Sequence, residues 1–348
     1  MKELKLNNRT NVSGSIHQKT IDYLESDEDK KKYAEYRDKF EKASNFKKIY
    51  DYPIHIDLEI DNICNYACSF CPIGQPDTEL GKWYQKKQEI PKEKIFQIID
   101  ECKNIGVNSI QFSLVNEPLA NKNIFEILKY TTSKKFEDVF IVSNGSLLDE
   151  KRALKLLDTN ITKIQFSLDA FKASTYEKNR FTKIKKPGLY EKVKNNILNF
   201  INLRNKLGKK FPLVRVSFIE LEENLDEISD FDKFWSNKVD AIHYQKLTDY
   251  KKKIINFDEF KDKIRCNMSN FRLSIKADGN VRPCCVGYGE QILIGNIYKN
   301  SLKEIWNSKL FKDFQKMHYD YIYHEHVFYY SIKFPFTVSG IKEMTAYF

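Results

Sequence analysis

Three cysteines lie within eight residues, in the stretch CNYACSFC. Cys64, Cys68 and Cys71 follow the spacing Cys-x3-Cys-x2-Cys, with no fourth cysteine to complete the set. Thiolates bind zinc, copper(I) and iron–sulfur clusters. A structural zinc site usually takes four ligands in two separated pairs, and a ferredoxin-type cluster takes four cysteines. Three thiolates on a four-iron cluster leave one iron with an open coordination position, which is typical of a reactive site.

The composition favours a cytoplasmic protein with reduced thiols. The N-terminus has no apolar signal-peptide core, and no run of about 18 apolar residues predicts a membrane span. In a reducing compartment, clustered cysteines are better explained as metal ligands or catalytic groups than as disulfides. The net charge is +10, but the lysines are scattered among acidic residues. We therefore do not expect a nucleic-acid partner.

The elements around the cysteines follow a regular strand–helix rhythm. The stretch IHIDLEI, from Ile54 to Ile60, alternates apolar and polar residues as a strand does. The next stretch, 91–106, has helical apolar spacing between a proline and a glycine. Five more strand-like segments, separated by helical ones, extend to about residue 244. This alternation predicts an α/β fold of parallel βα units, either a barrel or an open doubly wound sheet, with chemistry at the carboxyl ends of the strands.

The cysteine triplet, directly after the first strand, resembles that of the radical S-adenosylmethionine (SAM) superfamily, including an aromatic residue, Phe70, before the last cysteine. The resemblance implies a partial (β/α)6 TIM-like barrel. It also implies a [4Fe–4S] cluster on Cys64, Cys68 and Cys71 whose open iron binds SAM. Reductive cleavage of SAM would then yield a 5′-deoxyadenosyl radical that abstracts a hydrogen atom from the substrate.

Later strand ends carry further matches to this family. VNEPL resembles its Gly-Gly-Glu-Pro motif, with Val115 and Asn116 in place of the glycines. VSNGSLL resembles its Thr-Asn-Gly turn, and FSLDA its ribose-contacting segment. Arg180 matches an arginine that pairs with the SAM carboxylate in related enzymes; Ser167 and Asp169 are also explained as caps of the next helix. The implied cofactor-binding residues are Phe70, Asn116, Glu117, Pro118, Ser143, Asn144, Ser167, Asp169 and Arg180.

A second cysteine set follows the strand–helix region. Cys266, Gly279 and Cys284 have the spacing Cys-x12-Gly-x4-Cys, and Cys285 is adjacent. This set resembles the opening of the SPASM or twitch extension, which holds auxiliary iron–sulfur clusters. The further cysteines of that extension are missing here. Either the auxiliary site is reduced or absent, or the tail is an altered end that impairs the protein.

We expect an N-terminal helical extension (1–50), a radical SAM core (51–245), a linker (246–265), an incomplete SPASM-like region (266–317) and an atypical aromatic tail (318–348). Within the SPASM-like region, a hairpin turning at Asp278-Gly279 precedes one helix over 301–317. Cys102 lies on a helical apolar stripe and is expected in the core, whereas His318, His324 and His326 are expected at the surface.

The resemblance implies a radical SAM enzyme. We expect it to oxidise or epimerise a small or carbohydrate-linked substrate, with flavodoxin or ferredoxin as the electron donor. A peptide- or protein-modifying maturase is the first alternative. The second is a non-catalytic interaction protein that binds an iron–sulfur cluster or zinc; the strand-end NEP, SNG and SLDA segments argue against it, because a scaffold does not need them.

Overall fold

The computed structural model describes residues 10–11, 16–182, 187–247, 267–283 and 292–320. Cys266, Cys284 and Cys285 lie outside these residues, as do nearly all of the expected linker and tail. The predictions for these segments therefore stay predictions. None of the helices in the described part is long and apolar enough to cross a bilayer.

One sheet forms the frame of the molecule, and its neighbours run in the order β1-β7-β6-β5-β4-β3-β2-β8-β9-β10. Strands β2 to β7 pair in parallel with their sequence neighbours, as the alternation predicted. Within the described residues the order does not close on itself, which agrees with a partial barrel. The strands are β1 Thr10–Asn11, β2 His55–Leu58, β3 Ser109–Gln111, β4 Asp138–Ser143, β5 Lys163–Ser167, β6 Leu213–Glu220, β7 Ala241–Lys246, β8 Arg272–Ile275, β9 Asn280–Arg282 and β10 Gly295–Asn296.

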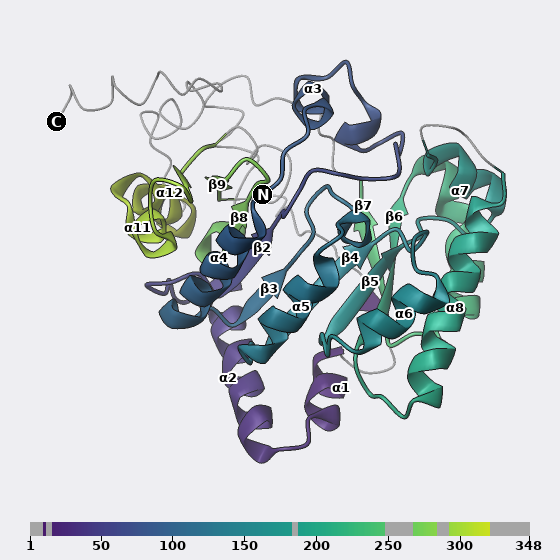
Figure 1. Cartoon of the computed structure of the whole chain (residues 1–348), viewed down its shortest axis with the longest axis horizontal. Coiled ribbons are helices and arrows are strands. Elements are labelled where there is room, and N and C mark those ends of the chain that lie inside the picture. The colour runs from purple at the N-terminus through teal and green to yellow at the C-terminus, as the bar shows by residue number, and fades with distance from the viewer. Residues whose placement is uncertain (1–9, 12–15, 183–186, 248–266, 284–291, 321–348) are drawn as a thin grey trace.

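Helices α4, α5, α6 and α8 lie along one face of this sheet (Figure 1). The described helices are α1 Ile16–Tyr23, α2 Asp27–Ser44, α3 Glu79–Gln85, α4 Lys92–Ile105, α5 Ile124–Ser133, α6 Glu150–Leu157, α7 Ala173–Asn179, α8 Leu189–Lys206, α9 Ile228–Trp235, α11 Leu302–Asn307 and α12 Lys309–Asp320. Helix α4 is capped at its C-terminus by Gly106, whose φ of 96° suits a residue without a Cβ. Cys102 on α4 is fully buried, as predicted.

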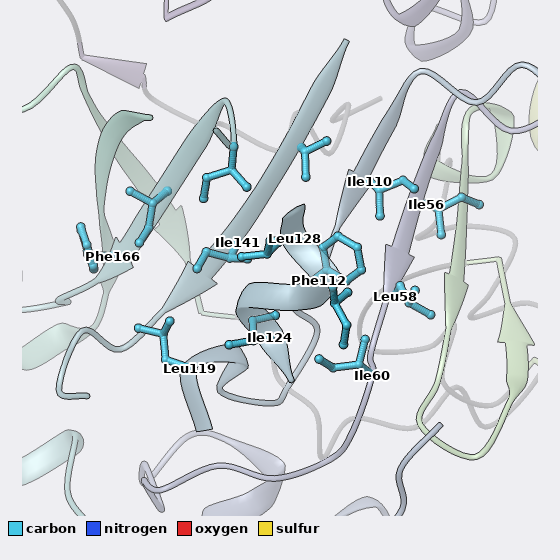
Figure 2. Packing of buried hydrophobic residues seen from close by; sticks show 14 of the residues in the cluster. Ile56, Leu58, Ile60, Ile110, Phe112, Leu119, Ile124, Leu128, Ile141 and Phe166 are labelled. Atoms are coloured by element: carbon cyan, nitrogen blue, oxygen red, sulfur yellow. The ribbon is translucent and has the colours of Figure 1, made fainter. Parts of the chain in front are cut away.

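The main core fills the space between the sheet and these helices. Figure 2 shows Ile56 and Leu58 of β2 and Ile110 of β3 in the same packed layer as Ile124 and Leu128 of α5. The alternate residues of β2, His55 and Asp57, are buried as well, although their side chains are polar. The strands are therefore buried on both faces, as is usual for a parallel sheet.

The C-terminal elements extend the sheet beyond β2 and contribute to the main core. The hairpin β8–β9 turns at Gly279, as predicted, and β8 pairs in parallel with β2, which the sequence pattern did not reveal. The single helix expected over 301–317 is wrong, because an extended residue, Ser308, separates α11 from α12. His318 is also not at the surface: it is fully buried, with its ring 4.6 Å from that of Phe314.

Candidate active site

The cysteine loop follows β2 and is anchored to the end of α7. The amide of Ala67 donates to the carbonyl of Phe181 at 2.7 Å, and the amide of Ser69 donates to that of Asn179 at 2.9 Å. The loop then turns tightly, so that a Cβ on Gly74 would lie 2.1 Å from the carbonyl oxygen of Cys68. A short 3-10 turn, η1 (Pro72–Gly74), ends the loop. The loop's course is therefore set by backbone contacts as well as by the cysteines.

All three cysteines of the loop have free thiols in a largely buried setting. Burial raises the pKa of Cys64 well above its ordinary value and raises that of Cys68 as well. Burial raises the pKa of Cys71 to about 12, and the neighbouring Cys68 adds to this effect. Burial in apolar surroundings makes thiols inert, whereas a bound metal stabilises the thiolate. The donor set therefore suits a metal centre better than a free nucleophile.

The geometry bears on the kind of metal centre. Among the described residues, no three His, Cys, Asp or Glu side chains converge as the ligands of one metal ion do. The thiolates of a [4Fe–4S] cluster bind different irons, so they do not need to converge on one point. The backbone amide of Tyr66 donates to the Cys64 sulfur at 3.4 Å, and the Arg180 guanidinium donates to the Cys68 sulfur at 3.9 Å. Hydrogen bonds to the sulfurs and a nearby cation both fit a negatively charged thiolate centre.

Glu117 lies beside this loop in a fully buried position. Its amide donates to the carbonyl of Ile63 at 2.8 Å, one residue before the first cysteine. Its carboxylate accepts hydrogen bonds from the Ser143 hydroxyl and from the backbone amide of Asn144, both at 2.7 Å. Burial nevertheless raises the pKa of Glu117 to about 7. The motif after β3 and the motif after β4 are thus joined directly, as expected for neighbouring strand ends.

Asn116, one residue earlier, has an unused donor. Its Oδ1 accepts from the amide of Leu114 at 3.1 Å, but its buried Nδ2 has no hydrogen-bond partner among the described residues. Buried polar groups are usually paired, so this amide at a strand end is available to a ligand or to a water molecule. Asn116 stands where the related motif has a glycine, and it offers a donor that a glycine side chain lacks. Pro118 follows Glu117 and begins a buried 3-10 turn, η2 (Pro118–Ala120).

A side-chain network ties the cysteine loop to the end of β4. The side-chain amide of Asn144 donates to Oδ1 of Asn65 at 2.9 Å, and Nδ2 of Asn65 donates to the Ser146 hydroxyl at 2.8 Å. Asn65 lies between the first two cysteines and was not predicted as a site residue. Tyr66 and Tyr176, whose buried hydroxyls lie 3.4 Å apart, were not predicted as site residues either. A polar residue inside the metal motif was the available signal for Asn65.

Asp169 and Arg180 form a buried ion pair at the end of β5. Nε of Arg180 donates to Oδ2 of Asp169 at 2.7 Å, and Nη2 donates to the same oxygen. The guanidinium also lies 5.6 Å from the centre of the Phe70 ring. Ser167 is half-buried at the end of β5, in register with Ser217 of β6. Arg180 is therefore paired within the chain and is not the exposed arginine that is the default for this residue type.

The chain matches the radical SAM superfamily over residues 58–234 and an iron–sulfur cluster-binding domain, SPASM, over residues 266–325. It is 26% identical over 294 residues to the antilisterial bacteriocin subtilosin biosynthesis protein AlbA of Bacillus subtilis (strain 168), covering 74% of this chain and 60% of AlbA. It is also 27% identical to a probable GTP 3′,8-cyclase of Methanocaldococcus jannaschii, covering 51% of this chain and 53% of the cyclase. The chain thus spans less than two thirds of either relative.

Solved structures share the fold. Streptococcus suis SuiB bound to S-adenosylmethionine aligns with a TM-score of 0.56 at 15% identity, covering 84% of this chain and 75% of SuiB. The protein anSMEcpe with bound AdoMet aligns with a TM-score of 0.56 at 15% identity, covering 77% of this chain and 84% of anSMEcpe. The fold and the family match over more than half of the chain together confirm the resemblance found in the sequence. The chain belongs to the radical SAM superfamily and carries a SPASM-type C-terminal region.

Proposed function

We propose that this protein is a radical SAM enzyme whose [4Fe–4S] cluster is held by Cys64, Cys68 and Cys71. The observation that carries the proposal is that one loop holds three largely buried thiols. The neighbouring segment after β3 carries an unsatisfied donor, Asn116 Nδ2. The amide of Glu117, next to Asn116, is hydrogen-bonded to the residue before Cys64. A cluster with an open iron and a ligand that needs a donor fit this arrangement. When bound, the cluster and SAM supply one-electron chemistry that removes a hydrogen atom from the substrate.

The residues around the loop have distinct proposed roles. Asn116 donates to bound SAM, and Glu117 holds the 115–118 and 143–144 loops together through Ser143 and Asn144. Arg180 offsets the negative charge of the thiolate centre, since it already contacts the Cys68 sulfur. Asp169 orients Arg180, and Ser167 lies at the same strand end for contact with the ribose. Phe70 and Pro118 give the site apolar walls.

We also propose an auxiliary iron–sulfur cluster in the C-terminal region. The match to the cluster-binding domain over 266–325 supports this cluster. Of the two explanations for the missing cysteines, it favours an auxiliary site with fewer cysteines over an altered tail that impairs the protein. Cys266, Cys284 and Cys285 are its candidate ligands, and all three fall in or beside this domain. Iron quantification separates the cases: about eight irons per chain support two [4Fe–4S] clusters, and about four support one.

For the substrate, the comparisons favour a peptide. AlbA, whose name assigns it to the biosynthesis of a bacteriocin, is aligned over 74% of this chain. SuiB, which has also been solved bound to its precursor peptide SuiA, shares the fold. The expectation of a small or carbohydrate-linked substrate is the second candidate, and the match to GTP 3′,8-cyclases favours a small molecule within it. The electron donor, flavodoxin or ferredoxin, stays an expectation.

The test is reductive cleavage of SAM. The full chain is reconstituted anaerobically with iron and sulfide, given SAM and dithionite, and assayed for 5′-deoxyadenosine. We expect product from wild type, and more of it when the correct substrate is added, which allows short peptides encoded beside the gene to be compared with GTP. No product from a sample with a spectroscopically verified [4Fe–4S] cluster would favour the non-catalytic alternative.

A further inference from the structure

A buried acid–base cluster lies at the end of β2, outside the cofactor-contacting residues described above. Glu59 is fully buried and its carboxylate lies 3.3 Å from Nζ of Lys276, which is itself 1% exposed. The hydroxyl of Tyr84 donates to Oε1 of Glu59 at 3.0 Å and also contacts the Lys276 ammonium. Lys276 lies 5.3 Å from the centre of the Trp83 ring as well. The cluster is therefore a desolvated ion pair with a tyrosine and an aromatic wall.

The members of this cluster come from three different parts of the chain. Glu59 lies five residues before Cys64, at the start of the segment that leads into the cysteine loop. Tyr84 lies on α3, which follows the loop. Lys276 follows β8, at the turn of the hairpin that leads toward Cys284. The cluster thus joins the radical SAM core to the iron–sulfur cluster-binding domain.

Backbone hydrogen bonds extend the cluster to the 115–118 loop. Oε1 of Glu59 accepts from the amide of Val115 at 3.2 Å, and Oε2 accepts from the amide of Ala277 at 3.3 Å. One carboxylate therefore contacts the residue before Asn116 and the residue after Lys276. The hairpin and the loop that carries the unsatisfied donor Asn116 Nδ2 are thus held by the same carboxylate.

A purely structural role explains this arrangement poorly. Burying an ion pair costs desolvation energy, and well-packed apolar residues of similar volume are often as stabilising. Buried ion pairs are best attested where they define a specific geometry. Here the pair fixes the position of the hairpin relative to the 115–118 loop.

We propose that Glu59 and Lys276 are positioning residues that couple the iron–sulfur cluster-binding domain to SAM binding. Neither residue contacts SAM in this proposal, which rests on the function proposed above. Glu59 holds the amide of Val115, Lys276 holds Glu59, and the hairpin holds Lys276. Coupling energies between sites typically change affinity by 5- to 150-fold, so loss of either residue is expected to weaken SAM binding by about tenfold.

The experiment is a double-mutant cycle on SAM affinity in the reconstituted full chain. The SAM dissociation constant is measured by calorimetry for wild type, Glu59→Gln, Lys276→Met and the double variant. Each single variant is expected to weaken binding about tenfold, and the double variant no further, because both changes break the same link. Electron paramagnetic resonance spectra with and without SAM give a second readout of cofactor contact. Additive losses, or dissociation constants within twofold of wild type, would overturn the proposal.

A matched control separates coupling from general damage. Lys163 is also a buried lysine paired with a buried aspartate, Asp138, but this pair lies at the amino ends of β4 and β5, away from the site. Lys163→Met is expected to lower stability without changing SAM affinity. If Lys276→Met loses its iron, Lys276→Gln replaces it, since glutamine keeps a hydrogen-bond donor. If wild type does not bind SAM, the proposed function is wrong. If wild type binds SAM and the variants bind it with the same affinity, only the proposed coupling is wrong.

Discussion

Arg180 directs two guanidinium nitrogens at one carboxylate oxygen of Asp169, and Asp169 makes this contact from a left-handed backbone with a φ of 60°. The other oxygen, Oδ1, accepts from the amide of Ile219 at 2.9 Å. A single aspartate thereby connects β5, β6 and the arginine nearest to Cys68. Both residues are buried, so neither charge is screened by water.

Asp169→Asn is expected to destabilise the protein by about 3–5 kcal/mol, because it leaves the buried Arg180 without its counter-charge. Asparagine tolerates the left-handed backbone, so strain does not contribute. Chemical denaturation measures the free energy of unfolding. The control is Asp226→Asn, which breaks the exposed pair with Lys172 and is expected to have little effect. Equal effects of the two substitutions would contradict a special role for the buried pair.

Cys68→Ala is expected to abolish assembly of the radical SAM cluster, since two thiolates cannot hold what three do. Iron content and the visible absorption of the reconstituted protein measure the loss. Cys102→Ala is the matched control, because Cys102 is buried in the core on α4, outside the cysteine loop. It is expected to keep its iron at a small cost in stability. Unchanged iron in Cys68→Ala would show that the ligand assignment is wrong.

Gly74→Ala is expected to disrupt cluster assembly without removing a ligand. Its Cβ would lie 2.1 Å from the Cys68 carbonyl oxygen and 2.7 Å from that of Ala67, so the loop between the cysteines must shift. Gly188→Ala is the comparison, because its Cβ meets nothing within 4 Å and only the left-handed φ of 82° is strained. That strain costs about 1–2 kcal/mol. The prediction fails if both variants retain the iron of wild type.

Asn116→Ala is expected to weaken SAM binding about tenfold, which is the effect of losing one hydrogen bond of about 1.4 kcal/mol. Stability should change little from loss of the Nδ2 donor, since Nδ2 has no partner in the described part of the protein. Asn108→Ala removes a buried asparagine at the opposite end of β3 and serves as the control. SAM dissociation constants and thermal unfolding are measured for both. An unchanged affinity in Asn116→Ala would remove Asn116 from the SAM site.

The stability of the N-terminal helices is expected to depend on pH through His17. Burial lowers the pKa of His17 from 6.5 to about 3, and nearby Arg37 adds to this effect. The imidazole, 2.9 Å from the Tyr33 hydroxyl, stays neutral in the fold while the unfolded chain takes up a proton below about pH 6.5. Its contribution to stability is therefore present above pH 6.5 and is lost as the pH falls toward 3.

The maximum slope from one such group is about 1.4 kcal/mol per pH unit. Denaturant unfolding of reconstituted wild type and of His17→Gln is compared at pH 7.5 and pH 5.5. The free energy of unfolding is expected to fall more for wild type than for the variant. Equal losses in the two proteins would show that His17 protonates as easily in the fold as in the unfolded chain.

Local patterns in the sequence were enough to predict the parallel α/β frame, the cysteine loop and its place after the first strand. These features are local: alternation over a few residues predicts a strand, apolar spacing predicts a helix, and the order of elements predicts parallel pairing. The capping box of Ser301 and Glu304 was readable for the same reason. The strand-end motifs after β3, β4 and β5 were also found, since parallel strands bring their carboxyl ends to one edge.

Which distant groups meet could not be predicted from local patterns and follows from the fold. The pairing of β8 with β2, the contact of Lys276 with Glu59 across 217 residues, and the packing of His318 leave no local pattern in the sequence. Arg180 was predicted to face a cofactor, and its pairing with Asp169, a residue with a left-handed backbone, was not predicted. The family could be recognised because the spacing of the cysteines is a local pattern, whereas the charged side chains around the loop are placed by long-range packing.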